Sequence, residues 1–249
     1  MPTVETVLQG FTVATDQGGP GLCGVYLIRG KKTFLVDPSH LGRRRQLLQA
    51  FETLKIDPDT LDAIVLTHLN WDHALNIDLF PNTKVLVHAK EWEYVQNPKP
   101  NDWATPRYMP AILGKHHLET FTGELQIDDG VRIIETPGHT AGHCSVVVDT
   151  PDGRAVIAGD ALPNARSVRS RRPSFVFWDE AEAAASIDKI VAAGDIMYPG
   201  HDRPFRIKDG ATHYFGKSKI TIVTVPEPNE DDLAITIATQ AQPPFFVLK

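Results

Sequence analysis

Residues 67–76, THLNWDHALN, hold two histidines, an aspartate and an asparagine within one short stretch. Imidazole and carboxylate groups are the ligands that zinc, manganese and iron take in hydrolases. The same residue types recur at His139 in ETPGHTAGH, at Asp160 in AVIAGD and at His201 in IMYPGHD. An isolated loop histidine is usually only solvated or hydrogen-bonded. Four such clusters in one chain together predict a metal site.

Each cluster comes directly after a short apolar segment that is typical of a buried strand. The segments are AIVLT before His68, VRII before His139, AVIAG before Asp160 and IMYPG up to His201. Side chains at strand ends project from one rim of a sheet, where loops converge on a ligand. The glycines in PGH and AGD permit the tight turns that aim these side chains. We therefore expect the four clusters to meet.

The remaining pattern predicts one α/β domain over residues 1–249, with strands in the majority. Residues 96–110 are rich in proline and lack periodicity, which indicates a long loop of the kind that forms lids or binding loops. Asp179 and Gly194 bound the clearest helix. The other expected elements are a hairpin at 24–37, a helix at 42–55, strands at 63–67 and 84–88, a helix at 90–96, a hairpin at 125–138, strands within 143–160 and a strand at 196–202.

Composition excludes several classes of function. The net charge of −6 argues against a general affinity for nucleic acid or for anionic membranes. No apolar stretch is long enough to span a membrane, and the N-terminus lacks a basic start with an apolar run, so we expect a cytoplasmic protein. The two cysteines, Cys23 and Cys144, are flanked by apolar residues and fit small buried hydrophobes better than a disulfide.

The order THLNWDH, PGHTAGH, AGD and PGHD closely resembles the metallo-β-lactamase superfamily of metal-dependent hydrolases. That family carries H-x-H-x-D-H, then a histidine, a bridging aspartate and a last histidine. The resemblance runs from FLVDP near residue 34 to PGHDRPF near residue 205. It implies an α/β fold, the four-layer αβ/βα sandwich, with the metal site at one edge between two sheets.

The resemblance also implies a role for each matching residue. His68 and His139 would belong to a first metal site, while Asp72, His73 and His201 would form a second, with Asp160 bridging both. Asp37 in LVDPS would support the site from behind, and His143 would make a structural hydrogen bond. Asp72 would in addition orient the nucleophile or accept its proton. The implied cofactors are one or two divalent metal ions, zinc first, with manganese or iron as alternatives.

Asn70 occupies the position of the family's second motif histidine. An amide oxygen is a weaker zinc ligand than imidazole. Three outcomes stay open: one metal in the second site alone, two metals with the first bound weakly, or a site tuned to manganese or iron. A fourth is a degenerate protein that keeps the fold and has lost turnover. A ligand role for Asn70 itself also stays open.

The implied chemistry is attack by a metal-bound hydroxide on an ester, lactone or related carbonyl of a small-molecule substrate. In size the chain is similar to the N-acyl homoserine lactonase and pyridoxolactonase branch. That branch has a tyrosine shortly after the bridging aspartate, where this chain has proline in GDALPNARS. Tyr108 in the proline-rich loop could replace it, or could serve only in packing.

The segment NARSVRSRRP places four arginines in what reads as one loop after Asp160. Arg166 and Arg169 would contact an anionic substrate if that loop reaches the metal rim, and otherwise the segment is a solvated basic turn. Two alternatives follow: a phosphodiesterase or ribonuclease of the same fold, and a catalytically degenerate metal- or anion-binding protein. The apolar tail QPPFFVLK either folds back on its own domain or contacts a second copy in a homodimer.

Overall fold

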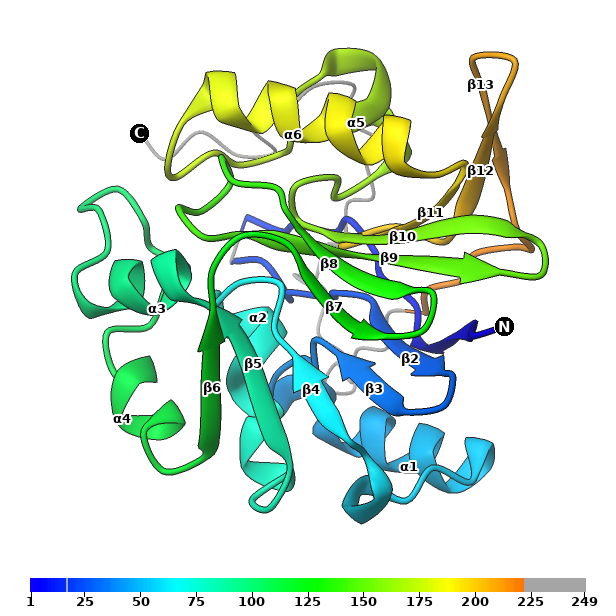
Figure 1. The fold of residues 1–249 in the computed structure, drawn as a ribbon. Helices are drawn as coiled ribbons and strands as arrows, with labels where there is room; N and C mark the ends of the chain where they lie inside the picture. The colour runs from blue at the N-terminus through cyan, green and yellow to red at the C-terminus, as the bar shows by residue number, and fades with distance from the viewer. Residues whose placement is uncertain (17, 222–249) are drawn as a thin grey trace, which may run out of the picture.

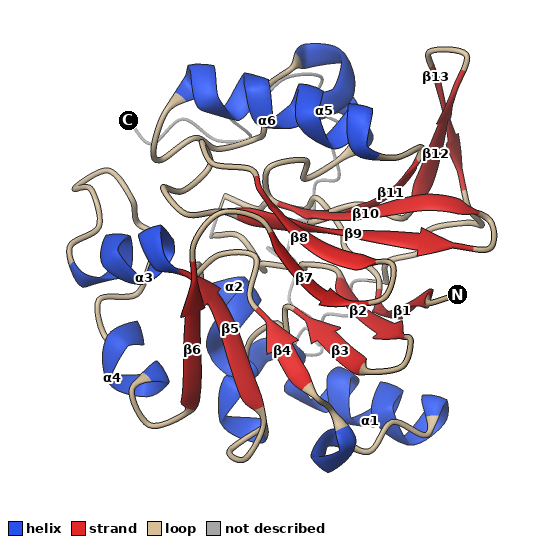
Figure 2. Ribbon diagram, viewed as in Figure 1, coloured by secondary structure: helices blue, strands red, loops and turns tan. Residues whose placement is uncertain are grey.

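The computed structural model describes residues 1–16 and 18–221, and its strands form two sheets (Figures 1 and 2). The predicted contact through the apolar tail falls outside these residues. The strands are β1 Thr3–Leu8, β2 Val25–Arg29, β3 Thr33–Val36, β4 Ala63–Val65, β5 Lys84–His88, β6 His117–Phe121, β7 Leu125–Asp128, β8 Val131–Glu135, β9 Cys144–Thr150, β10 Gly153–Gly159, β11 Ile196–Pro199, β12 Phe205–Lys208 and β13 Ala211–Tyr214.

The first sheet has the order β1-β2-β3-β4-β5-β6 and the second has the order β13-β12-β11-β10-β9-β8-β7. Strands β3 to β6 pair in parallel, and β10 pairs in parallel with β11. Parallel strands place their carboxyl ends at one edge, so β4, which leads to His68, and β10, which leads to Asp160, each deliver polar residues where their sheet ends.

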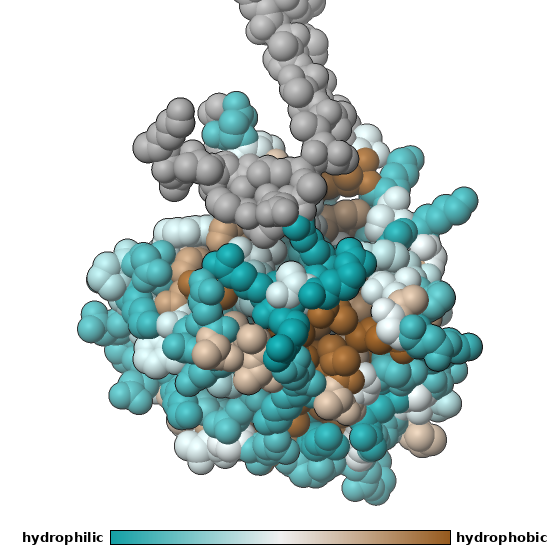
Figure 3. Space-filling view, turned by 90° about the horizontal axis from the view of Figure 1, so that it is seen from above, coloured by the Kyte–Doolittle hydropathy of each residue, from teal (hydrophilic) through white to brown (hydrophobic). Residues whose placement is uncertain are grey.

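Helices cover the outer face of each sheet, which gives four layers in the order helix, sheet, sheet, helix (Figure 1). The helices are α1 Arg44–Leu54, α2 Trp71–Ala74, α3 Ala89–Gln96, α4 Met109–Leu113, α5 Ala165–Ser170 and α6 Glu180–Ala193, with 3-10 turns at Leu41–Arg43, Pro58–Thr60 and Leu75–Leu79. The predicted αβ/βα sandwich is confirmed. Figure 3 views the α5 and α6 side, where hydrophilic side chains frame an apolar area.

Burial follows the layers. The space between the sheets is filled by side chains that alternate along the strands, such as Ile28 and Phe34 from one sheet and Ile133, Val146 and Ile157 from the other. A second cluster, including Leu47 and Phe51 of α1, lies beneath the helices of the first sheet. A third, including Ile187 and Ile190, lies beneath α6. These three packed clusters support the edge of the sandwich at which the polar residues meet.

The arginine-rich segment is the main local error of the sequence analysis. Residues 165–170 form the helix α5, whereas a loop was expected. The side-chain oxygen of Asn164 accepts a hydrogen bond from the Arg166 amide and caps this helix. Arg171 and Arg172 pair with Asp188 and Glu180 of α6. The segment is therefore a helical cover of the second sheet.

Candidate metal centre

The four predicted clusters meet at one edge of the sandwich. After β4 the chain is extended through Asn70, so His68 and Asn70 face the site while Leu69 between them enters the core. The single turn of α2 then presents Asp72 and His73. Loops after β8, β10 and β11 of the second sheet supply His139, Asp160 and His201. Both sheets thus contribute to one centre.

The residues assigned to the second metal site lie at ligand-to-ligand distances. His201 Nε2 is 3.2 Å from Asp160 Oδ1 and 3.3 Å from Asp72 Oδ2. His73 Nε2 is 3.3 Å from Asp160 Oδ1 and 3.8 Å from Asp72 Oδ2. Ligands about 2.1 Å from a tetrahedral zinc ion are about 3.4 Å apart. Asp72, His73 and His201 therefore have the spacing of a zinc site that Asp160 completes.

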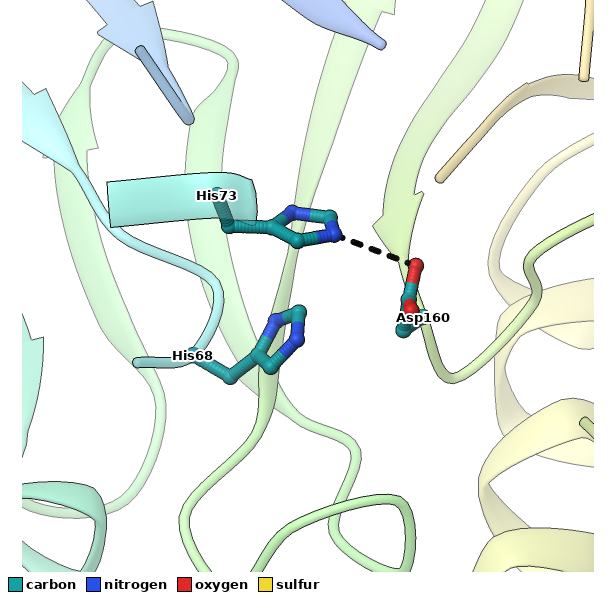
Figure 4. Close-up of side chains that lie close together, drawn as sticks. All are labelled: His68, His73 and Asp160. Carbon is teal, nitrogen blue, oxygen red and sulfur yellow. Dashed lines mark ion pairs between the residues drawn. The ribbon is translucent and has the colours of Figure 1, made fainter. Parts of the chain in front are cut away.

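The residues assigned to the first metal site lie beside this group. The His68 ring is 4.8 Å from the His139 ring and 4.2 Å from the His73 ring, measured between centroids. His139 Nε2 is 3.8 Å from Asp160 Oδ2 and 2.9 Å from Asn70 Oδ1. His68, His73 and Asp160 also converge closely enough to share an ion (Figure 4). The carboxylate of Asp160 thus faces both groups.

Hydrogen bonds fix which ring nitrogens face the centre. Asp37 Oδ2 accepts from His73 Nδ1 at 2.8 Å and from the Thr67 hydroxyl at 2.7 Å. Because the Thr67 proton goes to Asp37, the Thr67 oxygen accepts from His68 Nδ1, 2.9 Å away. The Nε2 atoms of His68 and His73 then face inward, where they and Asp160 Oδ1 make no hydrogen bond with the described residues. Asp160 Oδ1 instead forms ion pairs with His73 Nε2 and His201 Nε2. Buried nitrogen and oxygen atoms arranged in this way fit a metal cation.

The electrostatic field of the centre also favours a cation. Burial by itself lowers the pKa of His201, but Asp160 and Asp72 outweigh it and raise that pKa to about 10. Burial likewise lowers the pKa of His73, but Cys23, Asp160, Asp72 and Asp37 outweigh it and raise that pKa well above its usual value, so a proton occupies Nε2 of His73 where no metal ion displaces it. Burial and the neighbouring His73 and His139 hold the pKa of His68 well below its usual range. The centre attracts positive charge while one of its imidazoles stays neutral.

Three buried residues support the ligands from behind. Asp37, besides holding His73, accepts from the Thr67 amide at 2.8 Å, and its φ of 54° is strained for a non-glycine residue. His143 Nε2 accepts a hydrogen bond from the backbone amide of Asp160 at 3.0 Å and so holds the backbone of Asp160 in place. Glu91 of α3 accepts from the amides of Leu69 at 3.0 Å and Gly142 at 2.9 Å. Glu91 therefore ties the loops of both sheets together.

A cavity of about 300 Å³ opens above the centre. Its floor includes Asn70, Asp72, His139, Asp160 and His201. Its walls are mainly apolar and are formed by Phe11, Val13, Leu22, Trp71, Trp103, Phe175 and Phe177, among others. The Trp103 ring meets Phe175 and Phe177 edge-on, and Phe177 lies 5.3 Å from the His139 ring. Among the described residues that line this cavity there is no lysine or arginine.

The substrate contacts expected from the sequence lie elsewhere. Arg166 and Arg169 belong to α5, and neither lines the cavity. Tyr108, at the start of α4, is 56% exposed and also lies outside the lining. Trp103, in the proline-rich loop, does line it, whereas Trp178 packs against Tyr94. The structure therefore brings the predicted metal ligands together but leaves these three residues apart from them.

One wall of the cavity was not predicted from the sequence. The segment between β1 and β2, described at residues 10–16 and 18–22, lines it with Phe11, Val13 and Leu22. Glycines concentrated in GGPGLCG were a signal of close backbone approach: a side chain at Gly21 would collide with Trp71. Glu91 gave no signal, because a glutamate on a short helix ordinarily faces solvent.

Comparison with known proteins agrees with this architecture. The family model of the metallo-β-lactamase superfamily matches residues 18–201. Metallo-beta-lactamase domain-containing protein 1 of Xenopus laevis is 28% identical over 214 residues, 82% of each chain. An N-acyl homoserine lactonase of a Bacillus species is 26% identical over 163 residues, which are 63% of this chain and 62% of the lactonase. A solved N-acyl homoserine lactone hydrolase, with N-hexanoyl-L-homoserine at its catalytic metal centre, superimposes with a TM-score of 0.63 at 20% identity, covering 81% of this chain and 92% of that one.

Among the described residues, no helix is long and apolar enough to cross a membrane.

Proposed function

The chain belongs to the metallo-β-lactamase superfamily, and from this premise we propose that it is a metal-dependent hydrolase of uncharged esters or lactones with an apolar acyl part. The observation that carries the proposal is the buried cluster of His68, His73 and Asp160, which converge closely enough to hold an ion and of which Asp160 lines the floor of an apolar cavity. A cation fits this cluster, and the cavity accommodates a substrate directly above it.

We assign two divalent ions, zinc in the first instance, to the centre. Asp72, His73, His201 and Asp160 Oδ1 would hold one ion, and their spacing suits tetrahedral zinc. His68, His139 and Asp160 Oδ2 would hold the other. When bound, such ions polarise a carbonyl oxygen and lower the pKa of water toward neutrality.

The protein's own groups would position the reaction. Asp37 and His143 would keep His73 and Asp160 aimed at the metal centre through the hydrogen bonds described above. Asp72 borders the cavity and is almost completely buried, so its carboxylate could orient water and accept a proton from it. The aromatic walls would bind the acyl part and exclude bulk water from the carbonyl.

The lining favours an uncharged substrate over the anionic one expected from the arginine-rich segment. Two carboxylates, Asp72 and Asp160, are on the cavity floor, and the part of the lining that the structure describes contains no arginine or lysine. A phosphodiester would therefore meet no fixed cation apart from the bound metal. The lactonase among the relatives supports a lactone or a related carbonyl compound as substrate.

The test is a hydrolysis panel with zinc-, manganese- and iron-reconstituted protein. It should contain acyl esters and lactones of increasing chain length and an aryl phosphodiester. We expect hydrolysis of medium-chain esters or lactones that is lost in Asp160→Asn and unchanged in Arg166→Ala. Faster phosphodiester hydrolysis would establish the phosphodiesterase alternative instead. The absence of turnover with every metal, in protein that has bound it, would favour the degenerate binding protein.

A further inference from the structure

The side-chain amide of Asn70 is held in a single orientation by residues of the proline-rich loop. Asn70 Nδ2 lies 2.9 Å from the hydroxyl oxygen of Thr105, and Asn70 Oδ1 lies 2.9 Å from His139 Nε2. Asn70 and Thr105 are 2% and 4% exposed, so water does not compete for these bonds. The orientation of the Asn70 amide depends on which group accepts the hydrogen bond from the single hydroxyl proton of Thr105.

Asp102 settles that direction. Its Oδ1 accepts from the amides of Ala104 and Thr105, both at 2.9 Å. Its Oδ2 accepts from the Tyr94 hydroxyl at 2.8 Å and lies 2.7 Å from the Thr105 hydroxyl. A carboxylate surrounded by donors has only lone pairs to offer. The Thr105 proton therefore points to Asp102, and the Thr105 oxygen can only accept a hydrogen bond from Asn70 Nδ2.

The consequence is that Asn70 must present its oxygen to His139. His139 Nδ1 donates to the carbonyl oxygen of Phe175 at 2.8 Å, which leaves the lone pair of Nε2 facing Asn70 Oδ1. Two lone pairs 2.9 Å apart repel each other unless a proton bridges them or a metal ion binds both atoms from one side. His68 Nε2 is a further buried acceptor that makes no hydrogen bond with the described residues, and the His68 ring lies beside that of His139.

We propose that Asn70 Oδ1 is a ligand of the first metal site and that Asp102 and Thr105 are positioning residues that make it one. We call the hydrogen bonds from Thr105 to Asp102 and from Asn70 to Thr105 the relay. The relay prevents the side-chain amide of Asn70 from turning its Nδ2 donor toward the ion. The first site then has four ligands, His68, Asn70, His139 and Asp160. This inference rests on the proposed metal-dependent function and assigns to the 97–108 loop the task of completing the site.

The test compares zinc binding by calorimetry in matched variants of the full chain. Thr105→Val removes the hydroxyl at nearly constant shape, so the amide is free to rotate, and Thr105→Ser retains the hydroxyl. We expect two binding events in the parent. The weaker event should lose affinity about tenfold to a hundredfold in Thr105→Val. The tighter event should be unchanged, and Thr105→Ser should match the parent.

Two further variants make the test specific to the orientation of the amide. In Asp102→Asn, the backbone donors keep an oxygen at the Oδ1 position, so an NH2 group takes the Oδ2 position and repels the Thr105 proton. That proton then turns to Asn70 and reverses its amide, and we expect the same loss at the weaker event. Imidazole has no amide to orient, so in an Asn70→His background the change Thr105→Val should have no effect.

The outcomes separate the relay from the function. A parent that binds two zinc ions, with Thr105→Val equal to it, overturns the relay and leaves the hydrolase proposal intact. One zinc ion in the parent and two in Asn70→His would overturn the ligand role of Asn70. A parent that binds no zinc overturns the proposed function and the relay together. Circular dichroism of each variant confirms that the fold is retained, and loss of fold in Thr105→Val leaves Asp102→Asn to decide.

Discussion

The Nδ1 atom of His73 lies 2.8 Å from Oδ2 of Asp37, with both side chains buried and Asp37 in a left-handed backbone conformation. The same oxygen accepts from Thr67, which in turn holds His68. One carboxylate thus sets the orientation of an imidazole in each proposed metal site. Strain at φ 54° is retained where the surrounding structure needs that orientation.

Replacing Asp37 should therefore weaken metal binding although Asp37 contacts no ion. In Asp37→Asn one of the two acceptor oxygens becomes an NH2 group, which cannot accept from Thr67 or His73, and the charge that polarises the imidazole is lost. We expect zinc affinity to fall about tenfold to a hundredfold at both sites. Calorimetry measures this, with Asp62→Asn, on a surface loop, as the control. Unchanged affinity in Asp37→Asn would show that Asp37 has only a folding role.

Because Glu91 is buried, we expect its contribution to the folding stability to decrease as the pH rises. Burial raises its pKa from 4.5 to about 7, although the Leu69 and Gly142 amides act in the opposite direction. Between these values the folded protein binds more protons than the unfolded chain. The contribution of Glu91 to the free energy of unfolding is thus fully present below about pH 4.5 and decreases as the pH rises to about 7, by about 3 kcal/mol in total.

Urea denaturation of metal-free protein at several pH values measures this contribution. In Glu91→Gln the group no longer titrates, so the difference in unfolding free energy between parent and variant should change with pH across that window and be constant above it. A difference that is independent of pH would mean that Glu91 is ionised in the folded protein throughout. Glu93→Gln, at a neighbouring position on α3, is the control.

Trp103 should determine which acyl chains are accepted. It lines the cavity against Phe175 and Phe177 but is 59% exposed, so its removal costs little folding stability. In Trp103→Ala we expect the KM for long-chain esters to rise about tenfold, while that for acetyl esters stays the same, because only long chains reach the lost surface. Trp178→Ala, which alters an aromatic residue outside the lining, should change neither KM.

Arg43 should control the order of the segment between β1 and β2. Its guanidinium donates to the carbonyl oxygens of Gln9, at 3.1 Å, and of Cys23, which bracket that segment. In Arg43→Met both bonds are lost, and we expect protease cleavage within residues 10–22 to become at least several times faster. Arg45→Met removes an exposed arginine of α1 and should leave the cleavage rate unchanged. Equal cleavage in both variants would contradict the anchoring role.

Local pattern predicted the elements that are apolar and bounded by turns. Such elements include β2 with β3, β4, β5 and α6, whose expected positions are confirmed. The strands β1, β6, β12 and β13 were not predicted. Three of them, β1, β6 and β13, lie at sheet edges, where exposed residues such as His117 and Glu119 of β6 break the apolar pattern. The short helix α5 was missed because serine and arginine suit a loop as well as a single capped turn.

The order of the motifs was enough to predict the metal ligands of the candidate site. His68 and His201 are far apart in the sequence, and only their place at strand ends indicated that they converge. The contacts that position the ligands follow no short-range pattern. The pairing of Asn70 with Thr105, and of Glu91 with Gly142, depends on how loops from different elements pack. For the same reason the arginines of α5 were expected near a cavity that they do not line.

Zinc content per chain, measured by elemental analysis after reconstitution and removal of free metal, tests the central claim most directly. We expect about two equivalents in the parent and a loss of both in Asp160→Ala, because Asp160 faces both groups of ligands. Retention of about two equivalents in Asp160→Ala, or the absence of zinc in the parent, would contradict the assignment of this centre as a two-metal site.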